Sequence, residues 1–256
     1  MGTLSKSIFI IILSLICSFL IGKSIYEKEQ LNQARTMANM VEHIGQWASQ
    51  YRGIWTKEAK GEIVDQGSHL DTLTVSLANE DNSITSAEDM ATTLNFHLKN
   101  PALVQREISD LMIADQSKAS YRITSDKFMN ARNSPTAFER NAMEYMRANN
   151  VTEYSEVSNG RTLYARGLIA TAACMRCHES AEKAPYAVRS LYPTQGYGYE
   201  LGKVSGVISV KIPSSYSASS IFSALNLLSL IALGVFAFIV FLLCRRKANQ
   251  DWTDQD

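Results

Sequence analysis

The sequence predicts an α+β fold in which helices pack on an antiparallel sheet, with a long N-terminal helix and a membrane-spanning helix at each end. Three observations lead to this prediction. Apolar residues recur every three or four positions over residues 26–56, which is typical of an amphipathic helix. Alternating segments follow from residue 119 onward, and two of them are joined by Asn159-Gly160, a strong hairpin signal. Uncharged segments lie near both termini.

The helix over residues 26–56 continues from the first uncharged segment, and Gly53 is its expected end. Its apolar side chains form one stripe, because positions three and four apart lie on the same face of a helix. The stripe consists of Leu31, Ala34, Met37, Val41, Ile44, Ala48 and Tyr51, and Met40 and Trp47 widen it.

The other elements follow from caps, breaks and alternation. A Ser or Thr cap predicts a short helix within residues 83–98, which Asn100-Pro101 ends. Ser134 as cap and Pro135 at the first position predict a helix that runs to residue 150. The remaining expected elements are a helix over 101–113, strands over 119–126, 152–158, 162–170 and 204–213, and a loop over 192–203.

Both uncharged segments have the composition of membrane helices. Ser7 to Gly22 carries no charge over 16 residues, about 24 Å of helix, which flanking lysines can extend to the interface. Ile221 to Cys244 is uncharged over 24 residues, long enough to span with some tilt. Three cationic residues, Arg245 to Lys247, follow directly and predict a cytoplasmic C-terminus. A cleaved signal peptide is the alternative for the first segment.

The expected location is the bacterial inner membrane, with the lipid bilayer as a partner and the main domain in the periplasm. The sequence is divided accordingly into a cytoplasmic N-terminus (1–6), a membrane helix or signal anchor (7–23), a periplasmic domain (24–219), a second membrane helix (220–244) and a cytoplasmic tail (245–256).

Charge and cysteine usage exclude two classes of protein. The 25 basic residues balance the 25 acidic ones, so nucleic acid is not an expected partner. Of the 4 cysteines, Cys17 and Cys244 lie in the uncharged segments, which leaves only Cys174 and Cys177 in the exported domain. One close pair in nearly 200 residues does not make a disulfide scaffold.

These two cysteines stand in the order C-x-x-C-H with His178, a motif typical of c-type haem attachment. Two thiols at this spacing can add to the two vinyl groups of one porphyrin, and the next imidazole can reach the iron as its proximal ligand. One covalent haem c is therefore expected. A zinc site, a redox-active C-x-x-C pair and a local disulfide are the alternatives that remain open.

The other contacts of such a haem are less constrained by the sequence. Methionine and histidine are usual sixth ligands, so Met37, Met40 and His43 on the long helix are the candidates for the distal side. Each has an ordinary alternative, because Met37 and Met40 also fit a core and His43 a helix flank. Arg166 and Tyr164, on the strand before the motif, are candidates for contacts with the haem, or for an ordinary solvated strand face.

Four segments carry a resemblance to a known family: "NPALVQREIS", "FERNAMEYM", "YARGLIATAACMRCHES" and "GYGYELGKVSGVISVKIP". The chain resembles, from about residue 30 to 213, the bacterial c-type haem domain with a PAS-like fold. That family, once a domain of unknown function, supplies the periplasmic input module of sensor kinases, diguanylate cyclases and chemoreceptors. Arg52 stands where a glycine is expected. The resemblance implies haem on Cys174 and Cys177, with His178 as proximal ligand.

Two functions follow as expectations. The resemblance implies a redox or small-ligand sensor that acts through a partner protein. Only 12 residues follow Cys244, too few for a kinase or cyclase, which favours a membrane-tethered electron-transfer cytochrome with a redox partner instead. A haem enzyme is not expected, because no further catalytic constellation stands out. A homodimer through the long helix is expected by analogy only.

Overall fold

The computed structural model describes residues 3–58, 71–76, 93–213 and 227–253. The chain divides into one unit of residues 1–30 and 214–256 and a second of residues 31–213. Helix α1 (Thr3–Gln50) contributes to both units, and α7 (Leu227–Thr253) belongs to the first.

Within the described residues, no helix combines the length and the apolar character needed to cross a membrane. The spans predicted at residues 7–23 and 220–244 are therefore not confirmed and stay predictions; residues 220–226 lie outside the described part.

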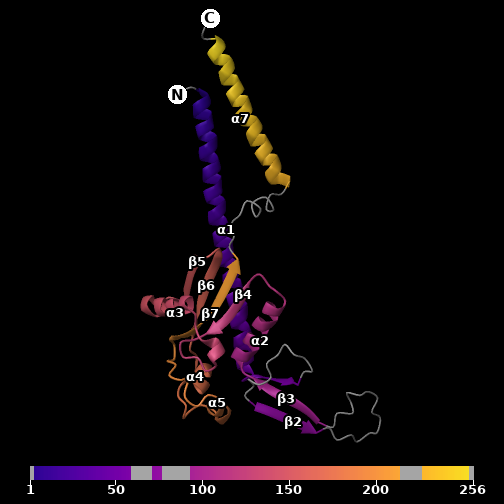
Figure 1. Cartoon of the computed structure of the whole chain (residues 1–256), viewed down its shortest axis with the longest axis vertical. Helices are drawn as coiled ribbons and strands as arrows, with labels where there is room; N and C mark the ends of the chain where they lie inside the picture. Colours follow the sequence, from indigo (N-terminus) through magenta and orange to yellow (C-terminus); the bar gives the residue numbers. More distant parts are fainter. Residues whose placement is uncertain (1–2, 59–70, 77–92, 214–226, 254–256) are drawn as a thin grey trace, which may run out of the picture. The chain divides into compact units, whose positions relative to one another are not determined.

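The second unit is built on a four-stranded antiparallel sheet in the order β4-β7-β6-β5 (Figure 1). Its strands are β4 (Ser120–Thr124), β5 (Glu153–Ser158), β6 (Arg161–Ile169) and β7 (Val204–Pro213), and all four were predicted. Asn159 and Gly160 join β5 to β6 with positive φ angles of 50° and 67°. This conformation matches the twist of the two strands, which is why Asn-Gly is favoured there.

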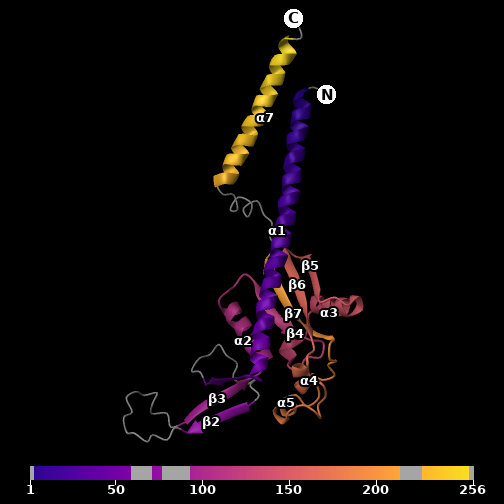
Figure 2. The same ribbon diagram turned by 180° about the vertical axis from the view of Figure 1, so that it is seen from behind.

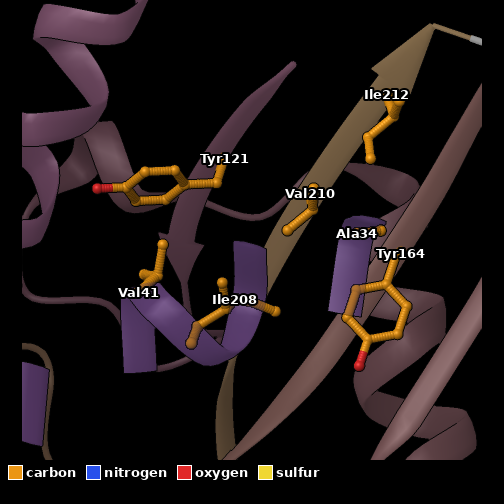
Figure 3. Packing of buried hydrophobic residues seen from close by; sticks show 8 residues of the cluster. Ala34, Val41, Tyr121, Tyr164, Ile208, Val210 and Ile212 are labelled. Carbon is orange, nitrogen blue, oxygen red and sulfur yellow. The ribbon is translucent and has the colours of Figure 1, made fainter. Parts of the chain in front are cut away.

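Helix α1 covers one face of this sheet. Ala34, Ala38 and Val41 are buried against side chains of β4, β6 and β7, which point toward α1 in Figure 3. Figure 2, seen from behind, shows α1 passing in front of the sheet. The small alanines let the helix approach the strands closely, while the apolar side chains of the strands fill the space between them.

The apolar stripe of α1 is only partly buried, which corrects its predicted width. Ala34, Val41 and Ala48 are buried as expected, whereas Met40 is 63% exposed and Trp47 is 51% exposed. They lie on a side of the helix that faces away from the sheet, since a flat sheet buries only one strip of a helix.

Helix α3 (Ala137–Asn149) packs on the opposite face of the sheet, where Ala142, Met143 and Met146 form a second buried cluster with β6 and β7. Its cap differs from the predicted one. The Thr136 hydroxyl accepts a hydrogen bond from the backbone of Glu139, whose carboxylate accepts one in return from the backbone of Thr136. This reciprocal capping box satisfies two backbone donors, so Thr136 is the cap rather than Ser134.

Helix α2 (Pro101–Ala114) has the predicted extent and is capped by Asn100. It crosses α1 at Gly45, where a Cβ would collide with the side-chain amide of Gln105. That amide donates a hydrogen bond of 2.6 Å to the carbonyl of Val41. The glycine therefore lets a buried polar side chain join the two helices without an unpaired donor.

A second, three-stranded sheet was not predicted. It consists of β1 (Ile54–Lys57), β2 (Asp71–Ser76) and β3 (Thr93–Lys99), in the order β1-β3-β2. The short helix expected within residues 83–98 is thus wrong over residues 93–98, and the rest of that segment lies outside the described residues. Leu94, Phe96 and Leu98 alternate with a period of two, which fits a strand and outweighed the capping signal.

Candidate functional site

The cysteine motif lies on a short helix, α4 (Ala172–His178), directly after β6. Cys174 and Cys177 are one turn apart, so both thiols lie on the same side of the helix. Both side chains are half-buried, and neither cysteine forms a disulfide. The hydroxyl of Thr171 lies 3.3 Å from the Cys174 sulfur. Burial raises the pKa of the Cys177 thiol, and the nearby charge of Arg176 opposes this.

His178 is held in a defined tautomer. Its Nδ1 lies 2.7 Å from the carbonyl oxygen of Gly196. Because a carbonyl can only accept, Nδ1 carries the proton in this hydrogen bond. Burial lowers the pKa of His178, although the bond to Gly196 acts in the opposite direction, so the neutral ring is favoured. A neutral imidazole protonated at Nδ1 keeps the lone pair of Nε2 for a metal.

The loop before β7 also fixes the plane of this ring. Tyr199 stacks on His178 with 4.3 Å between the ring centroids and 13° between the ring planes. The backbone N–H of Tyr199 donates to the carbonyl of His178 at 3.1 Å, and that of Gly198 donates to Glu179 at 3.0 Å. Three residues of one loop, Gly196, Gly198 and Tyr199, therefore orient the end of α4.

Gly196 is required at its position for two physical reasons. Its φ angle is +90°, a conformation that side chains disfavour. In addition, a Cβ built there would overlap Cγ of Met129. The residue before it reinforces this contact, because the Gln195 side chain donates to the carbonyl of Met129. The carbonyl that orients His178 thus belongs to a glycine that nothing larger can replace without movement.

We expect Gly196→Ala to destabilise the domain more than Gly202→Ala. Gly202 also has a positive φ, of +77°, but has open space around its Cβ position. Gly202→Ala should therefore lower the stability only by the cost of a left-handed backbone, about 1–2 kcal/mol. Gly196→Ala should lose a further amount of about 1–3 kcal/mol, because the added methyl group overpacks the site. Urea unfolding of both variants measures the difference. Partial recovery in Gly196→Ala with Met129→Ala would confirm the overlap as the cause; equal losses in the two single variants would contradict it.

Arg166 and Tyr164, the candidate haem contacts, lie in a polar network on the α1 side of the sheet. Arg166 lies 3.3 Å from Glu42 of α1 and 3.2 Å from Glu153 of β5, and its Nε donates to the Tyr164 hydroxyl at 3.3 Å. Burial acts to raise the pKa of Glu153, but Arg35, at 2.9 Å, and its other partners hold it below its usual range. Tyr164 is fully buried in the core. Their predicted role beside a haem is untested.

The distal candidates lie on α1. Met40 and His43 line one open groove of about 550 Å³, together with residues such as Trp47. Met37 is half-buried and packs against the core below α1, which agrees with its ordinary role as core filler. The structure therefore places Met40 and His43 in one groove, whereas Met37, one turn of α1 away from Met40, packs against the core. None is assigned to the iron, and the distal ligand stays a prediction.

The structure bears on two of the alternatives to haem, a zinc site and a redox-active cysteine pair. Among the residues that the structure describes, no three His, Cys, Asp or Glu side chains gather in a way that could hold a metal ion. Cys174 does stand in the first turn of a helix, as a redox-active pair would, but β6 and β7 on either side of α4 are antiparallel. The βαβ setting of such redox motifs is therefore not the setting here.

Comparison with known proteins assigns the domain to a family. The model of the Tll0287-like family, described as Tll0287, matches residues 23–213. The chain belongs to the Tll0287-like family. The matched range contains the whole four-stranded sheet, α4 and the loop that holds His178.

One solved structure that is similar to this chain carries the name of the family. The crystal structure of the cyanobacterial haem protein Tll0287 aligns at 17% sequence identity over 74% of this chain and 98% of that chain, with a TM-score of 0.49. No curated protein matches this Tll0287-like chain significantly.

Proposed function

We propose that this Tll0287-like domain carries one covalently attached c-type haem, bound by Cys174 and Cys177 and ligated at iron by Nε2 of His178. Membership of a family named after a protein described as a haem protein supports the proposal. The observation that carries it is the hydrogen bond from His178 Nδ1 to Gly196, at 2.7 Å. Haem-ligating histidines need this kind of outer contact to fix the tautomer and the ring orientation.

Two thiols and one imidazole are the side chains that a covalently attached haem requires. In attachment, each thiol S–H adds across one vinyl C=C, so that sulfur and hydrogen both end on the side chain of the porphyrin and no oxidant is needed. The half-buried thiols of Cys174 and Cys177 can be reached by such a partner. The bound iron would supply one-electron redox chemistry and a sixth coordination position. The protein itself positions the imidazole and, through the Tyr199 ring, shields one of its faces.

The function that we propose is sensing: a periplasmic, PAS-like haem domain, anchored in the inner membrane, that responds to redox state or a small ligand and acts on a partner protein. The resemblance to periplasmic input modules supports it, as do the two uncharged segments beside the domain. A sensor needs an element that the haem can bias. The loop of residues 195–199 is such an element, because it contacts both His178 and Met129.

Electron transfer is the second candidate, and one observation favours it. Both cysteines are partly exposed, so a haem attached to them would keep an edge near the surface, where a redox partner can approach. No catalytic role is proposed.

Carbon monoxide separates ligand sensing from electron transfer and from redox sensing. We expect the reduced, haem-loaded full chain to bind carbon monoxide, with a shift of its Soret band, because a ligand sensor needs an open or easily displaced sixth position. Met40→Ala and His43→Ala, made in parallel, should speed binding if either side chain holds that position. A six-coordinate low-spin spectrum that carbon monoxide does not change would contradict ligand sensing and favour electron transfer or redox sensing.

A further inference from the structure

A second groove lies at the free edge of the four-stranded sheet, away from the cysteine motif. It has a volume of about 300 Å³ and is bounded by α2, by the edge strand β4 with its neighbour β7, and by the short 3-10 helix η2 (Ala131–Asn133). α2 and β4 lie beside each other in Figure 1. Every residue that lines it belongs to the second unit.

Positive charge is concentrated in this groove. Its lining holds four cationic side chains and one carboxylate, that of Asp110, although basic and acidic residues are equal in number over the whole chain. The excess therefore comes from the fold and not from the composition. The cationic residues are Arg106 of α2, Arg122 of β4, Arg132 of η2 and Lys211 of β7.

Arg122 is held in place before any ligand arrives. One of its terminal nitrogens donates to the carbonyls of Arg132, at 3.1 Å, and of Ser134, at 2.7 Å. Its Nε lies 3.6 Å from the buried carboxylate of Glu139. Arg132 in turn lies 3.9 Å from Asp110. A guanidinium positioned in this way loses little side-chain entropy on binding.

Ser209 gives an independent sign of a ligand. It is directly opposite Arg122 in the β4–β7 pairing and is two residues from Lys211 on the same face of β7. Ser209 is among the residues that line the groove but is only 1% exposed, and its hydroxyl has no hydrogen-bond partner among the described residues. A buried hydroxyl without a partner costs about 1–3 kcal/mol. A ligand oxygen in the groove would satisfy it.

We propose that this groove binds a small organic anion with one or two carboxylates. Arginine forks match the planar, two-oxygen geometry of a carboxylate. Ala102, Ile113 and Ile123 supply an apolar wall for the carbon chain. The volume lies at the lower end of small-molecule sites, which favours a compact acid. The site does not depend on the haem proposal.

Calorimetric titration of the purified full chain with succinate tests the site, with inorganic phosphate as the comparison anion. We expect saturable binding of succinate that is at least tenfold tighter than that of phosphate. Arg132→Gln and Lys211→Gln should each weaken succinate binding about tenfold. The matched controls are Arg161→Gln and Lys203→Gln, which remove exposed cations outside the groove. They should leave the affinity for succinate unchanged. No saturation by 10 mM succinate, a preference for phosphate, or equal losses in controls and groove variants would overturn the proposal.

Ser209→Ala gives a second test that does not alter the charge. If the hydroxyl serves the ligand, the variant weakens succinate binding severalfold while the melting temperature of the free protein stays the same or rises, because an unpaired polar group is removed. A lower melting temperature with unchanged succinate affinity would assign the hydroxyl to the fold and overturn its role in the site.

Discussion

Replacing both Cys174 and Cys177 by alanine should abolish covalent haem, so that the denatured chain no longer shows haem staining on a gel. The thioether bonds are the only links that survive denaturation, since an iron–histidine bond is lost when the chain unfolds. The full chain, expressed together with a haem attachment system, should stain strongly before the change and not at all after it. Each single variant should keep one thioether and stain more weakly.

Cys17→Ala is the matched control, because Cys17 is an exposed cysteine outside the second unit. It should stain like the parent chain. Immunodetection of all variants shows that a missing signal does not reflect missing protein. Staining that persists in the double variant would remove the basis for a c-type haem here, and haem of any kind would then have to be held without these sulfurs.

His178→Ala should leave the haem attached but remove the low-spin spectrum. Its Nε2 is the only ring nitrogen left for a metal, because Nδ1 donates to Gly196 at 2.7 Å. Without this ligand the iron should become high-spin, with a blue-shifted Soret band, while both thioethers still give full haem staining. Addition of imidazole to the variant should restore the low-spin spectrum, because it can occupy the space left by the side chain.

His97→Ala is the comparison for this variant. His97 lies on β3 of the small sheet, where its Nδ1 is 3.3 Å from the Thr72 hydroxyl. Its loss should not change the spectrum. If His178→Ala keeps the parent spectrum, His178 is not the iron ligand, and the Gly196 contact has only a structural role.

Sequence patterns predicted those elements in which local and tertiary preferences agree. β7 was predicted over its full length, and the β5–β6 hairpin from its Asn159-Gly160 turn. Both have apolar alternation or turn residues that favour one conformation. The predictions are wrong where the local signals conflict: the capping pattern before β3 predicts a helix where the strand forms, and Ser134 is predicted as the cap of α3 although Thr136 has the reciprocal partner.

In the candidate site, too, local patterns predict some features and the tertiary structure alone decides others. The spacing of Cys174, Cys177 and His178 is a local property, so the sequence alone determined the expected haem attachment and the proximal ligand. The surroundings of His178 come from residues about twenty positions further on, in a loop that local patterns describe only as irregular. Only the tertiary structure decided that Gly196 sets the tautomer and that Tyr199 covers the ring. It also gathered Arg106, Arg122, Arg132 and Lys211 from four separate elements into one groove, because long-range packing brings together charges that are unrelated along the chain.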